Sequence, residues 1–232
     1  MDKRKETIAA MFDEIAFKYD FLNHFLSLGI DKIWRRKVVK LVKKQNPSKI
    51  LDIAAGTGDL SIKLAQKIEN CSIIGADISE GMLEIARQKV AKKALTERVT
   101  FEIGDALDLK YSDCSFDAIT VAFGVRNFEN LQQGLTQMLR VTKEGGLVVV
   151  LELSMPQSKL VRWGYNIYFT KILPIIGRLT SKSSFAYNYL PMSVENFVSG
   201  EQFLELMNKV GYKNCRKRSL SFGIATVYYG TK

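Results

Sequence analysis

Between residues 49 and 153 the sequence alternates short apolar runs with amphipathic segments, and this alternation limits the fold more than any other feature. Nearly continuous apolar character is typical of strands buried on both faces of a parallel sheet. Strands that alternate with helices predict an α/β fold with a doubly wound, mostly parallel sheet. The apolar runs are KILDIA (49–54), SIIGADI (72–78), VTFEIGDA (99–106), FDAITVAF (116–123) and GLVVVLEL (146–153), with helices expected near 59–69, 80–94 and 129–142.

Both ends of the chain depart from this alternation. Apolar residues at helical spacing predict helices over about 7–45, whereas residues 157–195 form an insertion centred on the run LVRWGYNIYFTKILPIIGRL. A helix near 199–210 and two strand-like segments, 212–221 and 224–231, predict a terminal hairpin that completes a seven-stranded sheet with one antiparallel strand. At 232 residues we expect one domain. Its parts are a helical lid (1–48), an α/β core (49–154), an insertion (155–198) and a terminal helix with hairpin (199–232).

The net charge of +10 is concentrated at the two ends of the chain. Residues 1–49 carry a charge of +6 and residues 155–232 carry +8, whereas residues 50–154 carry −4. An acidic centre suits a cofactor that brings its own positive charge. Basic ends suit an anionic partner, either nucleic acid or phospholipid, and a solvated basic face that aids solubility is the alternative.

Composition disfavours several classes of protein. Cys71, Cys114 and Cys215 are widely spaced and form no CxxC pair, which favours reduced thiols in a cytoplasmic protein. His24 is the only histidine, so we expect no metal centre. The opening residues MDKRKETIAA lack the apolar run of a signal peptide, and no stretch of ~20 residues is both apolar and free of charge. A transmembrane helix is therefore not expected.

The first of three polar motifs, DIAAGTGD, follows the first predicted strand. Its turn through Gly56, Thr57 and Gly58 lets the backbone approach a ligand closely. Position 61 is a serine, so the third glycine of a dinucleotide fingerprint is missing. The flanking carboxylates of Asp52 and Asp59 would repel a pyrophosphate but attract an ammonium group and a neighbouring sulfonium.

Two more motifs follow the second and third strands. Asp77 can accept hydrogen bonds from both hydroxyls of a ribose, although it could instead cap the helix beginning near Ser79. Asp105 can accept from an adenine amino group while the backbone N–H of Ala106 meets a ring nitrogen. S-adenosylmethionine is the ligand that needs all three motifs. The predicted cofactor residues are Asp52, Gly56, Thr57, Gly58, Asp77, Ile78, Asp105, Ala106 and Ala122.

These motifs resemble those of class I, Rossmann-like methyltransferases. Almost the whole chain resembles the ubiquinone/menaquinone biosynthesis C-methyltransferase family, the demethylmenaquinone methyltransferases. The closer match is carried by an N-terminal signature (19–34), by the loop AFGVRN (122–127) on the substrate side, and by a second signature (140–154). The sequence departs from the family at Asp31, where histidine is common, at Thr142, where an aliphatic residue is usual, and at Glu144, where the family has proline.

The resemblance implies transfer of a methyl group from S-adenosylmethionine to a ring carbon of a polyprenylated quinol. Ala122 stands where members of the ubiquinone branch often have serine, which favours conversion of demethylmenaquinol to menaquinol. A polyprenyl methoxybenzoquinol of ubiquinone biosynthesis is the alternative substrate. Two other functions stay open, a nucleic-acid base methyltransferase and a protein that binds the cofactor without turnover.

Carbon is a poor nucleophile unless the quinol loses a proton, so the site must stabilise a quinolate. Arg126 follows the fourth strand and is the candidate for stabilising that charge, with Asn127 fixing an oxygen and Tyr19 of the lid contacting the same oxygen. A structural ion pair or a helix cap is the alternative for Arg126 and Asn127.

The insertion suggests where the protein works. Trp163, Tyr165 and Tyr168, with Arg162 between hydrophobic residues, suit a membrane interface, although an ordinary buried lid would look similar. We expect peripheral contact with the inner face of the cytoplasmic membrane. A nucleic-acid partner is not expected, because the aromatic residues lie among aliphatic ones rather than on basic stacking platforms. A homo-oligomer is compatible with the sequence.

Overall fold

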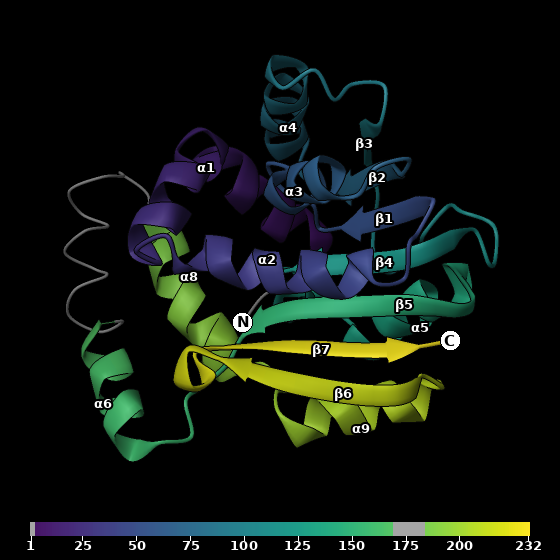
Figure 1. The fold of residues 1–232 in the computed structure, drawn as a ribbon. Coiled ribbons are helices and arrows are strands. Elements are labelled where there is room, and N and C mark those ends of the chain that lie inside the picture. The colour runs from purple at the N-terminus through teal and green to yellow at the C-terminus, as the bar shows by residue number, and fades with distance from the viewer. Residues whose placement is uncertain (1–2, 169–183) are drawn as a thin grey trace.

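The computed structural model describes residues 3–168 and 184–232 and confirms the predicted α/β fold. One seven-stranded sheet has the order β3-β2-β1-β4-β5-β7-β6 (Figure 1). Strands β1 to β5 are parallel, and β7 runs antiparallel to both β5 and β6, as the terminal hairpin predicts. The strands are β1 (Lys49–Ile53), β2 (Ser72–Asp77), β3 (Val99–Ile103), β4 (Phe116–Ala122), β5 (Thr142–Leu153), β6 (Lys213–Leu220) and β7 (Ala225–Thr231).

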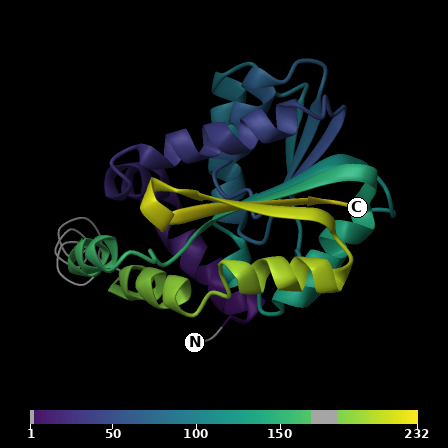
Figure 2. The same cartoon turned by 60° about the horizontal axis from the view of Figure 1, so that its bottom comes forward.

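Helices cover both faces of the sheet, as Figure 2 shows in a view turned from that of Figure 1. The chain order reverses between β2 and β4, which lie on either side of β1, and ligands of open α/β sheets bind at the strand ends beside such a point. The helices are α1 (Lys5–Leu26), α2 (Ile30–Lys43), α3 (Asp59–Lys67), α4 (Glu80–Lys92), α5 (Leu131–Val141), α6 (Lys159–Ile167), α8 (Ser184–Glu195) and α9 (Glu201–Val210), with short 3-10 turns η1 (Val125–Asn127) and η3 (Ser221–Gly223).

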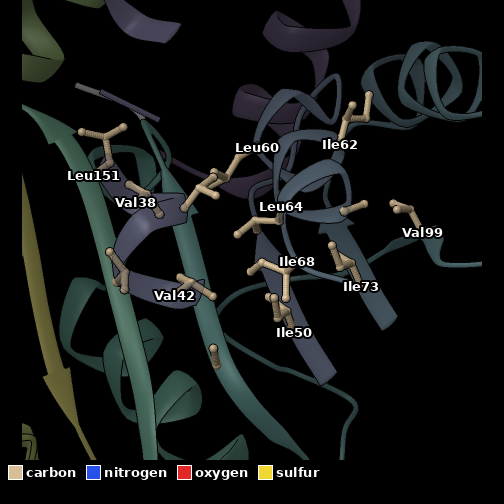
Figure 3. Close-up of a cluster of buried hydrophobic side chains, with 14 of the residues drawn as sticks. Val38, Val42, Ile50, Leu60, Ile62, Leu64, Ile68, Ile73, Val99 and Leu151 are labelled. Atoms are coloured by element: carbon tan, nitrogen blue, oxygen red, sulfur yellow. The ribbon is translucent and has the colours of Figure 1, made fainter. Parts of the chain in front are cut away.

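Alternate residues of the central strands enter opposite halves of the hydrophobic core. Ile50 of β1 belongs to the cluster that the sheet forms with α2, α3 and α4, where it lies beside Ile68 and Leu64 (Figure 3). Leu51, one residue later, belongs to the second cluster, which includes Leu135 of α5. Successive side chains of a strand point to opposite faces, so a strand buried on both faces needs apolar residues throughout. This explains why the strands could be recognised from their apolar runs.

The two N-terminal helices have different positions. Val38 and Val42 of α2 are fully buried in the larger core cluster, so α2 is a core helix. Helix α1 packs mainly on α4 and crosses the carboxyl ends of the strands. The predicted lid therefore corresponds to α1 alone. Of the predicted insertion, α6 and α8 are described, while residues 169–183 of its aromatic and aliphatic run lie outside the described residues, as does the side chain of His24.

Among the helices that the structure describes, none combines the length and the apolar character needed to cross a bilayer.

Candidate cofactor and substrate sites

A cavity of about 110 Å³ lies at the carboxyl ends of β1 to β4, beneath α1. We call it the strand-end cavity. Helix α1 provides one wall of it, including Lys5, Ile8, Phe12 and Tyr19. The strand ends provide the opposite wall, and six of the nine predicted cofactor residues lie there. These six are Gly56, Asp77, Ile78, Asp105, Ala106 and Ala122.

The turn after β1 brings bare backbone to this cavity. Gly56 has a φ of +54°, and a Cβ added there would meet nothing within 4 Å, so the backbone borders open space. Gly58 has a φ of +78°, and an added Cβ would lie 2.7 Å from the ring of Phe101. Both positions favour glycine, because residues with side chains rarely adopt this left-handed conformation. At 56 glycine also lets a ligand approach the backbone closely, and at 58 it leaves room for the ring of Phe101.

Asp77 holds the turn after β1 and the start of α4 through backbone hydrogen bonds, while the helix cap that the sequence left as its alternative role belongs to Ser79. Its Oδ2 accepts a hydrogen bond from the backbone N–H of Gly56 at 2.7 Å, and its Oδ1 accepts from that of Ser79 at 3.0 Å. Ser79 itself caps α4 by accepting from Met82. Each carboxylate oxygen has a second lone pair, so the carboxylate, which borders the cavity, can also accept from ribose hydroxyls. Burial raises the pKa of Asp77.

Asp105 is held at the opposite end of the same wall. Its Oδ1 accepts from the backbone N–H of Leu107 at 2.9 Å, and its Oδ2 lies 3.2 Å from Nζ of Lys5. The carboxylate of Asp105 can accept from an amino group, as adenine recognition requires. The polar groups of the cavity therefore fit an adenosyl cofactor: one carboxylate that can accept from the ribose hydroxyls, another that can accept from the amino group of the base, and a glycine turn between them.

The structure places Asp52, Thr57 and Gly58 behind the cavity wall, whereas the sequence predicted direct contact with the cofactor. Asp52 is buried, and its carboxylate accepts from Oγ of Ser61 at 2.5 Å and from Oγ1 of Thr120 at 2.7 Å. The hydroxyl of Thr57 donates to Asp20 of α1. These contacts fix the shape of the turn.

Asp59 was expected to attract the cofactor's ammonium group, but the charge of its carboxylate is already paired. Oδ1 of Asp59 lies 2.5 Å from Nζ of Lys89, and its Oδ2 lies 3.8 Å from Arg35. Asp59 therefore joins α3 to α4 and α2.

A second cavity, of about 460 Å³, lies beside the first, and we call it the apolar cavity. Its wall comes from α1, α2, η1, α6 and η3 and is mainly aromatic and aliphatic. Tyr19 and Phe123 line both cavities and therefore separate them. Other lining residues include Leu28, Ile30, Trp34, Leu153, Val161, Tyr165, Tyr168, Leu190 and Ile224.

Arg126 is held in the wall of the apolar cavity by Glu152, which is wholly buried. Its Nη1 donates to Oε1 of Glu152 at 2.8 Å and also to the carbonyl of Phe123, and its Nε donates to Oγ of Ser193 at 3.2 Å. Burial alone would lower the pKa of Arg126, but the charges around it, Glu152 foremost, raise it above its ordinary value. The structure thus contains the ion pair that the sequence left as an alternative, and it fixes a permanent cation beside the cavity.

The three predicted catalytic residues meet where the two cavities adjoin. Tyr19 borders both cavities, Arg126 borders the apolar cavity and Asn127 borders the strand-end cavity. Oδ1 of Asn127 accepts a hydrogen bond from the hydroxyl of Tyr189 at 3.0 Å. A methyl donor in one cavity and an acceptor in the other would therefore face each other at Tyr19.

The sequence missed two residues of this junction. Glu152 was recognised only as part of a signature, although a carboxylate inside an otherwise apolar strand is a signal for a buried ion pair. Phe123 has a φ of +63°, and the guanidinium carbon of Arg35 lies 5.3 Å from its ring centre. No sequence pattern marks that contact. Within the described residues, no group of three potential metal ligands comes together.

Comparison with known proteins shows that residues 1–232 match the ubiE/COQ5 methyltransferase family. A demethylmenaquinone methyltransferase of Bacteroides fragilis is 45% identical over 99% of this chain and 94% of its own length. A ubiquinone/menaquinone biosynthesis C-methyltransferase, UbiE, of Geotalea daltonii is 47% identical over 100% of this chain and 99% of its own.

Solved structures agree on the fold. A SAM-dependent methyltransferase of Thermotoga maritima superposes with a TM-score of 0.68 at 22% identity, covering 96% of this chain and 99% of the other. The [4+2]-cyclase SpnF superposes with a TM-score of 0.71 at 16% identity, covering 98% and 96%. Because a cyclase has the same fold, the reaction has to be argued from the site.

Proposed function

The chain belongs to the ubiE/COQ5 methyltransferase family, and from this premise we propose that it methylates a ring carbon of a prenylated quinol, converting demethylmenaquinol to menaquinol. It is a methyltransferase of quinone biosynthesis that uses S-adenosylmethionine. The observation that carries the proposal is the junction at Tyr19, where a cavity suited to an adenosyl cofactor adjoins a large apolar one.

The naphthoquinol branch is favoured by the relatives. Full-length relatives of Bacteroides fragilis and Deinococcus radiodurans, at 45% and 44% identity, are demethylmenaquinone methyltransferases. A fused, apolar ring system also suits a cavity whose wall includes Trp34, Phe123 and Tyr165.

When bound, S-adenosylmethionine supplies an electrophilic methyl group on a sulfonium. Asp77 and Asp105 would hold its ribose and base, and the bare backbone at Gly56 leaves room for its chain. Helix α1 forms one wall of the strand-end cavity and would exclude water from a bound cofactor. The two adjoining cavities would hold the methyl donor and the acceptor in position for in-line displacement.

Arg126 would act on the acceptor. Its fixed positive charge at the wall of the apolar cavity lowers the free energy of a quinolate, the form in which the ring carbon becomes nucleophilic. Glu152 keeps the guanidinium in place and protonated, since its carboxylate contacts both the side chain and the backbone N–H of Arg126. Asn127 and Tyr19 would orient the reacting oxygen from the cofactor side.

The same proposal gives the protein a location. A polyprenyl tail keeps the substrate in the bilayer, and none of the described helices can span one. We place the protein at the inner face of the cytoplasmic membrane, in peripheral contact. No nucleic acid takes part in this proposal.

The direct test is methyl transfer by the purified protein with S-adenosylmethionine and a short-chain demethylmenaquinol, followed by mass spectrometry. We expect the naphthoquinol to gain one methyl group at the unsubstituted ring carbon. A methoxybenzoquinol substrate and a mixed RNA preparation serve as competitors. Methylation of RNA alone would refute the proposal, and preference for the benzoquinol would move the protein to the ubiquinone branch.

Arg126 offers a sharper test of the mechanism. Loss of one preorganised donor to a developing oxyanion costs about 10²–10³ in turnover, so Arg126→Ala should lose about that much in single-turnover methylation. Arg126→Lys should recover little, because a point charge cannot replace a planar fork of donors. Cofactor affinity should stay near the wild-type value in both variants. Native turnover in Arg126→Ala would show that the residue is only structural.

A further inference from the structure

Exposed apolar side chains lie on the segments that line the apolar cavity. Three separate segments supply them: the turn before α2 with the first residues of that helix, helix α6, and the turn η3. Leu28 is 81% exposed, Trp163 is 65% exposed and Phe222 is 85% exposed. Each segment also lines the cavity, through Ile30, Val161 and Ser221. Figures 1 and 2 both place these segments at the same end of the molecule. We call the exposed residues Leu28, Ile33, Leu160, Trp163 and Phe222 the mouth surface.

Two members of the mouth surface hold an unusual backbone conformation. Leu28 has a φ of +50° and Phe222 a φ of +57°, in the left-handed region that favours glycine and asparagine. A bulky apolar side chain at such a position carries two costs. The left-handed backbone conformation is unfavourable for it, and its exposed apolar surface is unfavourable in water. At 81% and 85% exposure, neither Leu28 nor Phe222 buries enough surface against the described residues to offset this cost. Insertion into an apolar partner would bury both side chains.

The same segments are positively charged. Residues 27–44, 155–168 and 213–224 contain a single acidic residue, Asp31. Asp31 is buried and ion-paired with Arg35, so no carboxylate of these segments faces water. The exposed cations of the segments include Lys32, Arg36, Lys159, Arg162 and Arg218.

We infer that the mouth surface docks on an anionic phospholipid bilayer, so that the apolar cavity opens toward the acyl chains and takes up its substrate directly from the membrane. This inference rests on the proposed quinol substrate. Apolar side chains at the centre and cations around them match the two layers of a bilayer surface, acyl chains and anionic head groups. A nucleic acid would neutralise the cations but leave Leu28 and Leu160 in water. A symmetric second copy would bring like charges together.

The test is flotation of the full-length protein with vesicles of phosphatidylcholine, alone or mixed with phosphatidylglycerol, at low and high salt. We expect binding to require the anionic lipid and to weaken with salt. Phe222→Asn with Trp163→Gln should lower the partition coefficient at least about ten-fold, because two apolar side chains no longer enter the bilayer. Asparagine suits the backbone at 222, so the melting temperature should not fall.

A second variant tests the charges. Replacing Lys32, Lys159 and Arg218 with glutamine should lower the partition coefficient about five-fold for each cation removed. The matched controls are Ile103→Thr and Lys92→Gln, an exposed apolar residue on the opposite edge strand and an exposed cation on α4. Both controls should bind vesicles like the wild type.

All variants should methylate a water-soluble short-chain quinol at the wild-type rate, since none of these residues lines either cavity. Quinol methylation without vesicle binding would overturn the docking surface and leave the proposed function standing. Vesicle binding without quinol methylation would overturn the proposed function. Salt-sensitive binding to nucleic acid but not to vesicles, or a dimer lost in Phe222→Asn, would replace the bilayer with that partner.

Discussion

Among single residues, the carboxylates at the strand ends differ in what their oxygens contact. Asp52 faces two hydroxyls beneath the turn, Asp77 faces two backbone amides at the cavity, and Asp105 faces an amide and Lys5. Only the last two can reach a bound molecule. The first shapes the loop that such a molecule would contact. The same residue type therefore serves binding or folding according to its neighbours.

Asp77→Asn should weaken binding of S-adenosylhomocysteine about 10–100-fold in calorimetry. The change removes one charged acceptor, and hydrogen bonds to charged groups contribute about 1.5–3 kcal/mol. Glu84→Gln, an exposed carboxylate on α4, is the control and should bind normally. Native affinity in Asp77→Asn would remove the ribose contact from the proposed site.

Asp52 predicts a dependence of stability on pH. Burial raises its pKa from 3.8 to about 6, against hydrogen bonds from Ser61 and Thr120 that lower it. The folded protein therefore binds this proton more tightly than the unfolded chain, and the free energy of unfolding should fall as pH rises from about 4 to about 6. The loss is at most roughly 3 kcal/mol.

Urea titrations across this pH range would measure the effect, and Asp52→Asn should flatten it. Asp117 is the contrasting case. Partial burial would raise its pKa, but Lys143, Ser48 and the N–H of Lys49 hold it at about 2. Asp117→Asn should therefore lower the free energy of unfolding above about pH 4, and its difference from the wild type should shrink as pH falls from about 4 to about 2. An unchanged slope in Asp52→Asn would mean that Asp52 is not the titrating group.

At the scale of elements, α1 is fastened at two points over the strand-end cavity. Asp13 accepts from Oγ of Ser79 at 2.5 Å and from the N–H of Gly81 at 2.9 Å, and Asp20 lies 2.7 Å from Nζ of Lys89. A volume of about 110 Å³ is small beside the ~300–1,000 Å³ usual for ligand pockets. We therefore expect helix α1 to shift when a cofactor binds.

Asp13→Ala should speed release of S-adenosylhomocysteine about ten-fold in stopped-flow measurements. The variant loses two hydrogen bonds that hold α1 against α4. Glu14→Ala, the exposed neighbour on the same helix, should leave the rate unchanged. Equal release rates in both variants would show that α1 does not control access to the cavity.

The elements also show what a sequence can and cannot predict. Strands β1 to β4 end within three residues of their predicted ends, because their apolar runs stop where burial stops. Strand β5 begins at Thr142, four residues before the predicted start, since TKEG has no strand pattern and is ordered by pairing and by Gly145 at φ +74°. The partnership of Arg126 with Glu152 spans 26 residues and depends on β4 and β5 being neighbours. No local sequence pattern shows that β4 and β5 are neighbours, so the ion pair could not be predicted.

Over the whole molecule, one continuous sheet joins the first and last parts of the chain. Seven residues of β5, from Leu147 to Leu153, pair with β7. Both core clusters draw on the same central strands. A boundary between independently folding units would have to cut this sheet.

We therefore expect one calorimetric unfolding transition, with equal calorimetric and van't Hoff enthalpies. S-adenosylhomocysteine at about 100 times its Kd should raise the melting temperature by roughly 5–10 °C without splitting the peak. The control is ATP, which shares the adenosine of S-adenosylhomocysteine but carries a triphosphate in place of the amino-acid chain. ATP should leave the melting temperature unchanged. Two separable transitions would show that the N-terminal helices or the C-terminal hairpin unfold on their own.

Tyr19 and Phe123 form a wall common to both cavities, and a common wall has a thermodynamic consequence. Helix α1 bounds both cavities, so a molecule that shifts α1 on entering one cavity would also move the wall of the other. Occupancy of the two sites is then linked by a coupling free energy, and linkage is reciprocal: the factor by which the methyl donor tightens the acceptor equals the factor by which the acceptor tightens the donor. The wall between the two cavities would thus make the affinity of each site depend on whether the other is occupied.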